Sequence, residues 1–287
     1  MESNQPQSTQ NESNQPQSTQ NESNQNESNQ PQSTQNESTL IQLECNQKTT
    51  ETLLDENWAH IVALVDCSGS MAIINPQNTA NELTKLIREQ SASRITATLA
   101  RFSDTYKIIK NNVDGKEFMV SPNEINPNGP TAIQESFCKL IDDTGVQLAA
   151  MSGVRPSKVI IIILTDGAEN ASENEYAGRA GLELLRQKIK HQKEVYNWVF
   201  YLLAANMDAI ELGMTYGIEP CCCITYAHSE GGCSNVMYST SQAINRMITT
   251  PSSQLSANRS AVLTNTGYTI CERNISMQHC SGNYANS

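Results

Sequence analysis

A run of six apolar residues, Val159–Leu164, restricts the fold of this chain more than any other feature. Its β-branched content and its bounds, Lys158 before it and Thr165-Asp166-Gly167 after it, are typical of a strand buried on both faces. From Trp58 onward, further apolar runs alternate with amphipathic stretches. This alternation predicts a doubly wound α/β fold, with a mostly parallel central sheet flanked by helices.

The apolar runs and amphipathic stretches give the predicted elements. The strands are His60–Asp66, Arg94–Ser103, Lys158–Asp166, Asn197–Ala205 and, with a weaker pattern, Cys222–Tyr226. The helices are Asn78–Gln90, Ala132–Met151, Glu173–Glu194, Asp208–Tyr216 and Asn235–Ile248. The segment Tyr106–Met119 resembles a short turn and an antiparallel edge strand around Asp114-Gly115.

The first 39 residues have a different composition from the rest of the chain. After Met1 they contain no aromatic or aliphatic residue, and a decapeptide repeat begins at Glu2, Glu12 and Glu27. Without apolar surface to bury, nothing offsets the entropy cost of ordering, so we expect a disordered arm. A self-associating Asn/Gln tract is the alternative, which the repeated Pro and Glu oppose. The resulting division is a repeat arm at residues 1–50, one folded domain at 57–249 and a polar tail of unassigned structure at 250–287.

The charge balance excludes some classes of partner. The net charge is -11, from 19 basic and 30 acidic residues. Binding to nucleic acid or to an anionic membrane needs a basic surface, so we expect neither. The chain starts without a basic or apolar leader, and its longest apolar run is too short to cross a bilayer. We therefore expect an intracellular, cytoplasmic protein whose nine cysteines are reduced.

Three loops carry the candidate functional residues. Asp66-Cys67-Ser68-Gly69-Ser70 and Thr165-Asp166-Gly167 each follow an apolar strand, and Asn128–Ala132 opens a predicted helix. The carboxyl ends of parallel strands meet at one edge of a sheet, which is where open α/β sheets bind ligands. The three loops are therefore expected to lie close together.

These loops bring together oxygen atoms without a compensating positive side chain. Asp66 and Asp166 are two carboxylates that need a proton or a cation between them. Ser68, Ser70 and Thr131 add hydroxyl oxygens, and an all-oxygen set favours Mg²⁺ or Mn²⁺ over zinc. So sparse a set leaves a coordination position open. A carboxylate from another molecule is its natural occupant.

The pattern Asp66-Cys67-Ser68-Gly69-Ser70, then Thr131, then Asp166 resembles the metal-ion-dependent adhesion site of von Willebrand factor type A (VWA) domains. The resemblance covers roughly residues 57 to 249. Ser-Gly-Ser-Met and the later run Leu203–Ala209 are similar to stand-alone microbial and phage members. The resemblance implies a Rossmann-like fold in which Ser68, Ser70 and Thr131 bind the metal directly. It implies that Asp66 and Asp166 act directly or through water.

Each motif also has a purely structural interpretation. The Asp-x-Ser-x-Ser side chains could cap the helix Asn78–Gln90 or its preceding loop, Thr131 could be a helix N-cap, and Asp166-Gly167 could be a turn. Taken jointly, the three motifs favour the metal site. Asp208, at the start of a predicted helix, is expected to be an N-cap.

The cysteines suggest weaker candidates. Cys221-Cys222-Cys223, His228 and Cys233 have a zinc-like composition, but consecutive strand residues alternate between faces, which opposes convergence of the three sulfurs. Cys67 is expected to be a buried filler and not a reactive thiol.

The best functional hypothesis from sequence is a Mg²⁺-dependent protein-interaction module. Its metal would bind an Asp or Glu of a partner protein, and the resemblance also permits an ATPase or an assembly complex as partner. One alternative is a metal-dependent hydrolase on the same scaffold, although the chain has no phosphate-binding loop, no Gly-x-Ser-x-Gly and no His-Glu-x-x-His. The other is an assembly protein that uses the repeat arm.

Overall fold

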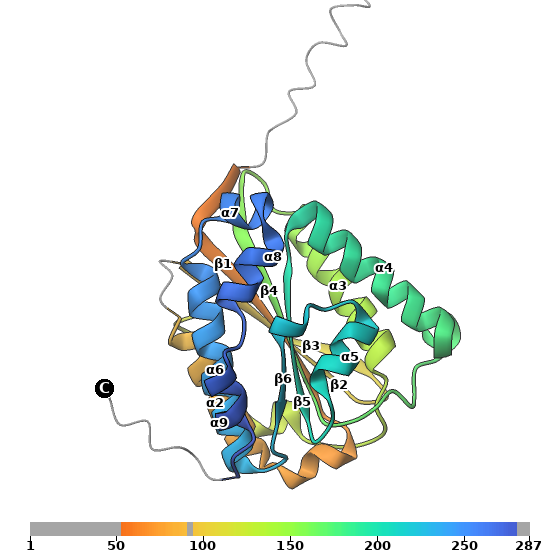
Figure 1. Cartoon of the computed structure of the whole chain (residues 1–287). Helices are drawn as coiled ribbons and strands as arrows, with labels where there is room; N and C mark the ends of the chain where they lie inside the picture. Colours follow the sequence, from red (N-terminus) through yellow and green to blue (C-terminus); the bar gives the residue numbers. More distant parts are fainter. Residues whose placement is uncertain (1–52, 91–93, 280–287) are drawn as a thin grey trace, which may run out of the picture. The chain divides into compact units, whose positions relative to one another are not determined.

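The computed structural model describes residues 53–90 and 94–279, so the predicted arm at residues 1–50 lies outside the described residues. Six strands form one sheet in the order β3-β2-β1-β4-β5-β6 (Figure 1). Only β3 is antiparallel to its neighbour, β2. The strands are β1 (Leu53–Asp66), β2 (Arg94–Phe102), β3 (Tyr106–Asp114), β4 (Val154–Thr165), β5 (Val199–Ala205) and β6 (Cys223–Tyr226).

Helices cover both faces of the sheet. In Figure 1, α2, α6 and α9 lie on one side of the sheet and α3, α4 and α5 on the other. The helices are α2 (Pro76–Arg88), α3 (Ile133–Ala149), α4 (Gly178–Tyr196), α5 (Ala209–Tyr216), α6 (Glu230–Ile248), α7 (Ser252–Ala257), α8 (Arg259–Thr266) and α9 (Ile270–Ser276). The predicted α/β fold, with a mostly parallel sheet between two helical layers, is confirmed.

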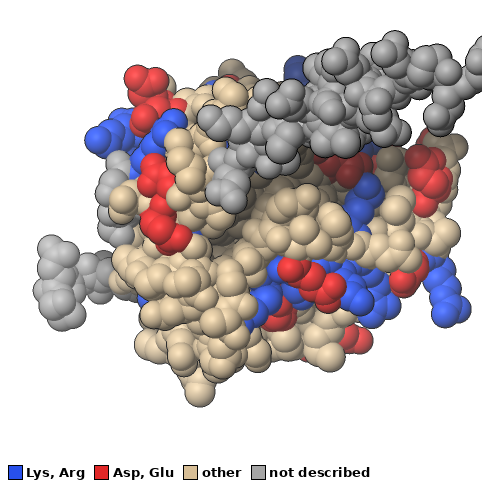
Figure 2. Space-filling view, turned by 90° about the horizontal axis from the view of Figure 1, so that it is seen from above, with Lys and Arg blue, Asp and Glu red and all other residues tan. Residues whose placement is uncertain are grey.

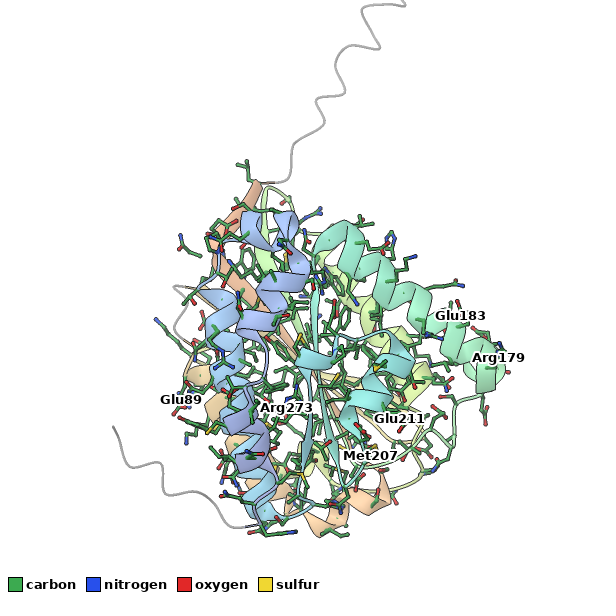
Figure 3. The ribbon with its side chains drawn as sticks, in the orientation of Figure 1. Glu89, Arg179, Glu183, Met207, Glu211 and Arg273 are labelled. Atoms are coloured by element: carbon green, nitrogen blue, oxygen red, sulfur yellow. The ribbon has the colours of Figure 1, made fainter. Side chains whose placement is uncertain are left out.

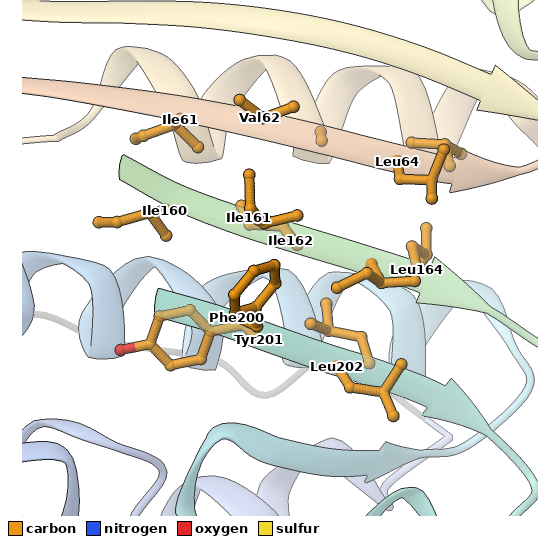
Figure 4. Close-up of a cluster of buried hydrophobic side chains, with 14 of the residues drawn as sticks. Ile61, Val62, Leu64, Ile160, Ile161, Ile162, Leu164, Phe200, Tyr201 and Leu202 are labelled. Atoms are coloured by element: carbon orange, nitrogen blue, oxygen red, sulfur yellow. The ribbon is translucent and has the colours of Figure 1, made fainter. Parts of the chain in front are cut away.

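The core is built from the three central strands. Side chains from β1, β4 and β5 pack together on both faces of the sheet (Figure 4). The run Val159–Leu164 is buried throughout, and Ile160 and Ile161 are fully inaccessible to solvent. At about 25 cal/mol per Å² of apolar surface, burial of such a run stabilises the sheet. The sequence prediction for this strand is confirmed.

Several elements begin earlier than predicted, and β1 and α6 differ most. β1 starts at Leu53, before the apolar run, because its first residues pair with Val154 and Arg155 at the start of β4. α6 starts at Glu230, five residues before the predicted Asn235. Its first turn contains Gly231 and Gly232, and a Cβ at Gly232 would overlap the carbonyl oxygen of Ala227. Glycine there permits close packing of the helix start on the preceding loop.

The C-terminal residues, which the sequence left unassigned, form three short helices. α8 and α9 pack on α6. The Arg246 guanidinium of α6 binds both carboxylate oxygens of Glu272 on α9, at 2.8 and 2.9 Å. The side-chain amide of Asn235 donates to the carbonyl of Ile275 at 3.1 Å. The described fold therefore extends beyond residue 249.

α9 also contacts the edge strand β6. The hydroxyl of Ser276 donates to the carbonyl of Thr225 at 2.7 Å, and the amide of Ala227 donates to the carbonyl of Ser276 at 3.0 Å. Arg273 donates to the carbonyl of Cys223, and Figure 3 shows Arg273 at α9. These contacts fix the segment that follows β6.

The surface charges are mixed where they can be seen. On the face viewed in Figure 2, acidic and basic side chains lie next to one another, and the visible described residues form no basic stripe there. Within residues 53–90 and 94–279, no helix is both long and apolar enough to cross a membrane.

Candidate metal centre

Asp66 ends the central strand β1 and is 1% exposed. Its Oδ1 accepts a hydrogen bond from the amide of Ser68 at 2.8 Å, and its Oδ2 accepts one from the hydroxyl of Thr165 at 2.7 Å. Burial raises the pKa of Asp66 above its usual value, and the nearby charge of Asp166 adds to this effect. The carboxylate thus joins the ends of β1 and β4. A bound cation would stabilise its negative charge.

A chain of close oxygen atoms links the first loop to the third. The Ser68 and Ser70 hydroxyl oxygens are 3.1 Å apart, and the Ser70 hydroxyl donates to Asp166 Oδ1 at 2.8 Å. Ser68 is buried, whereas Ser70 is exposed. The structure therefore brings Ser68, Ser70 and Asp166 together, with one side of the group facing solvent.

Thr131 lies against the third loop. Its amide donates to Oδ1 of Asn170 at 2.8 Å, and its carbonyl accepts from the amide of Asn170 at 3.0 Å. A Cβ at Gly167 would lie only 2.9 Å from Thr131 Oγ1, so glycine lets the threonine hydroxyl approach the turn after Asp166. All three predicted loops thus meet at the carboxyl edge of the sheet.

Glu169 holds two of these loops together, a role that the sequence analysis did not assign. Its carboxylate accepts hydrogen bonds from the amides of Gln134 in α3 and of Ala171 and Ser172 in its own loop, at 2.7 to 2.9 Å. A negative charge at a helix N-terminus is stabilising. Glu169 therefore fixes the third loop to the start of α3, next to Thr131.

The helix caps in the structure differ from two of the structural interpretations of the motifs and agree with the one for Asp208. Asn75 caps α2 through a hydrogen bond from Gln77, so the Asp66 loop is not that cap. The N-cap residue of α3 is Ala132 and not Thr131. Asp208 does cap α5, accepting from the amides of Ile210 and Glu211, as predicted.

The cysteines do not build a competing site in the part of the chain that the structure describes. There, no three side chains of His, Cys, Asp or Glu are grouped to hold a metal ion. Cys67 is 2% exposed, and burial raises the pKa of its thiol to about 12, as expected for a filler.

His228 is the residue near this site that sequence reasoning missed. It follows β6 by two residues, and its Nε2 lies 3.1 Å from Asp166 Oδ2. The sequence analysis considered His228 only together with the cysteines. Its position just after a parallel strand was the available signal, because that position places it at the same edge as Asp66 and Asp166.

The residues present fit a hard divalent cation. Among the described residues, the buried Asp166 Oδ2 has no hydrogen-bond partner, although a buried polar atom normally has one. The neighbouring oxygens of Ser68, Ser70 and Asp166 are 2.8 to 3.1 Å apart. Adjacent oxygen ligands at about 2.1 Å from one octahedral ion would be about 3.0 Å apart. The spacing is therefore compatible with ligands of Mg²⁺ or Mn²⁺.

Comparisons with known proteins give similar folds at low identity. No family model and no curated protein matches the chain. A von Willebrand factor type A protein from Catenulispora acidiphila is 16% identical, with a TM-score of 0.44 over 65% of this chain and 42% of that one. Proximal thread matrix protein 1 from the mussel byssus is 14% identical, with a TM-score of 0.45 over 66% of this chain and 47% of that one. The ArnB paralog VWA2 from Sulfolobus acidocaldarius is 15% identical, with a TM-score of 0.43 over 64% of this chain and 44% of that one. The chain thus spans less than half the length of each.

Proposed function

We propose that this protein is a Mg²⁺- or Mn²⁺-dependent protein-interaction module of the VWA type, in which the metal binds an Asp or Glu of a partner. The observation that carries the proposal is that the Ser68, Ser70 and Asp166 oxygens lie together, and that Asp166 Oδ2 has no hydrogen-bond partner among the described residues. The bound cation would supply a positive charge that attracts a carboxylate.

The chain's own residues have distinct tasks in this proposal. Ser68, Ser70 and Thr131 would provide neutral ligands, which leave the cation electrophilic. Asp66 would orient the first loop through its hydrogen bonds to Ser68 and Thr165. Asp166 would add charge. Ser70 and its neighbour Gly69 are exposed, which leaves room for the partner's carboxylate on the solvent side.

The proposal is one of binding and not of turnover. The partner's carboxylate would occupy the open coordination position of the metal, and dissociation of the partner would leave that position open again. An ATPase or an assembly complex remains the class of partner suggested by the resemblance.

The test uses an array of peptides that each contain a single Asp or Glu, beside matched peptides with Asn or Gln. We expect the full chain to bind acidic peptides in Mg²⁺, and binding to be lost in EDTA and in Asp66→Ala and Thr131→Ala. Asp208→Ser is the matched control, because serine keeps the N-cap of α5 while one exposed carboxylate is removed. Equal binding in EDTA and Mg²⁺, or by the Asp66→Ala variant, would overturn the proposal.

A further inference from the structure

The contact between His228 and Asp166 is unusual for a buried pair. Nε2 and Oδ2 are 3.1 Å apart, and the two side chains are 9% and 1% exposed. The two atoms form an ion pair only if the imidazole is protonated, and among the described residues neither of them has a hydrogen-bond partner. With a neutral imidazole, a nitrogen lone pair and a carboxylate oxygen face each other with no proton between them. A cation bound by both atoms would then take the place of that proton.

The distance is compatible with two adjacent ligands of one octahedral ion. Two adjacent ligands about 2.1 Å from an octahedral ion are about 3.0 Å apart, whereas tetrahedral ligands at that bond length are about 3.4 Å apart. The observed 3.1 Å is closer to the octahedral value. The same range describes the oxygen pairs Ser68–Ser70 and Ser70–Asp166, at 3.1 and 2.8 Å.

The backbone around His228 is fixed from three directions. The amide of Ala227 donates to the carbonyl of Ser276 on α9, and Ser229 caps α6 by accepting from the amide of Gly232 at 3.1 Å. The amide of His228 donates to Oδ1 of Asn206, which follows β5, at 3.4 Å. The backbone that carries the imidazole is thus held by α6, α9 and the loop after β5.

From these contacts we propose that His228 supplies a nitrogen ligand to the cation held by Asp166, and that this ligand makes the site favour transition-metal ions such as Mn²⁺ over Mg²⁺. The inference rests on the metal site of the proposed function and adds a ligand to it. Imidazole suits first-row transition metals, whereas Mg²⁺ prefers oxygen ligands. A nitrogen ligand therefore changes the relative affinity for the two ions.

The experiment measures Mn²⁺ and Mg²⁺ binding to the full chain by calorimetry, with electron spin echo spectroscopy of the Mn²⁺ complex to detect a coordinated imidazole ¹⁴N. We expect the wild type to show the ¹⁴N coupling. In His228→Gln the coupling is lost and Mn²⁺ affinity falls about 10-fold or more, a loss typical of metal-site residues, while Mg²⁺ affinity falls less than about 3-fold. His191→Gln, which changes an exposed histidine of α4, is the matched control and should leave both affinities unchanged.

The outcomes separate this inference from the proposed function. Absence of ¹⁴N coupling in the wild type, a measurement that requires no variant, overturns the assignment of His228 as a ligand. An equal loss of both affinities in His228→Gln also overturns it, since the histidine would then only orient Asp166. If Ser68→Ala still lowers both affinities in these cases, the metal site of the proposed function stands. If neither ion binds the wild type, both proposals fail.

Discussion

The ion pair between Arg246 and Glu272 predicts a measurable contribution of the C-terminal helices to stability. The guanidinium makes two hydrogen bonds to the carboxylate and further ones to the carbonyls of Thr266 and Gly267, at 3.3 and 2.8 Å. The two side chains are 32% and 10% exposed. The perturbation is Arg246→Gln, which removes the charge and the bidentate geometry.

The expected cost lies between two limits. Breaking a fully buried pair costs about 3–5 kcal/mol, and breaking an exposed pair costs about 0–1 kcal/mol. Because Glu272 is largely buried and Arg246 is partly exposed, we expect a loss of about 2.5 kcal/mol in the free energy of unfolding. Urea denaturation followed by circular dichroism should then show a midpoint lower by about 1 M, for a slope of about 2.5 kcal/mol per M.

The matched control is Lys190→Gln on α4. Its partner is Glu194 at 4.0 Å, and the two side chains are 73% and 64% exposed, so the expected cost is below about 0.5 kcal/mol. Glu272→Gln should give an intermediate loss, because glutamine still accepts from the amide of Thr269. If Arg246→Gln and Lys190→Gln destabilise the protein equally, the reasoning that α9 is held to α6 by this pair is refuted.

Three further predictions concern the loops and the acid response. In EDTA at neutral pH, Asp66→Asn should raise the unfolding temperature, because it removes a buried charge; each kcal/mol of stability gained corresponds to about 2–4 °C. The same variant should lose the stabilisation that Mg²⁺ gives the wild type. Calorimetry measures both effects. Gly167→Ala should lower Mg²⁺ affinity about 10-fold with little change in stability, since its Cβ would displace the hydroxyl of Thr131; an unchanged affinity in titration calorimetry would contradict this. Burial raises the pKa of Glu219, but Arg259 and a nearby lysine lower it by more, so the net shift is downward. The stabilisation from Glu219 is therefore present above its unfolded pKa of about 4.3 and is lost as the pH falls through the lower folded pKa. The difference in unfolding free energy between wild type and Glu219→Gln should therefore shrink toward pH 3. Urea titrations at several pH values measure this difference.

The parts of the fold that could be predicted are those with local signals. The run Val159–Leu164 is typical of a buried strand. Asp66, Ser68 and Ser70 could be placed at a sheet edge, because strand direction in a parallel sheet determines where such loops meet. An antiparallel edge strand was predicted within Tyr106–Met119 and β3 is that strand, but Asp114-Gly115 lies at its end and its connection to β2 is at residues 103–105. These features depend on periodicity and on turn residues, which a single sequence displays.

The parts that could not be predicted depend on contacts between distant segments. The helix α9 has a polar sequence, and it is held by Arg246 and by the backbone of β6, neither of which is a pattern within residues 250–287. His228 and Glu169 gain their roles from neighbours 35 or more residues away, namely Asp166 and Gln134. Contacts between side chains of different loops depend on the tertiary structure, and local sequence patterns do not indicate them.

The contacts of α9 with β6 have a consequence for how copies of this protein meet one another. An edge strand exposes unpaired amides and carbonyls that can recruit a strand from a second molecule, and β6 is such an edge. The carbonyls of Cys223 and Thr225 already accept from Arg273 and Ser276, so they are not free to extend the sheet. A truncation that removes α9 would uncover them, and the shortened protein should aggregate through strand pairing at concentrations where the intact chain stays in solution.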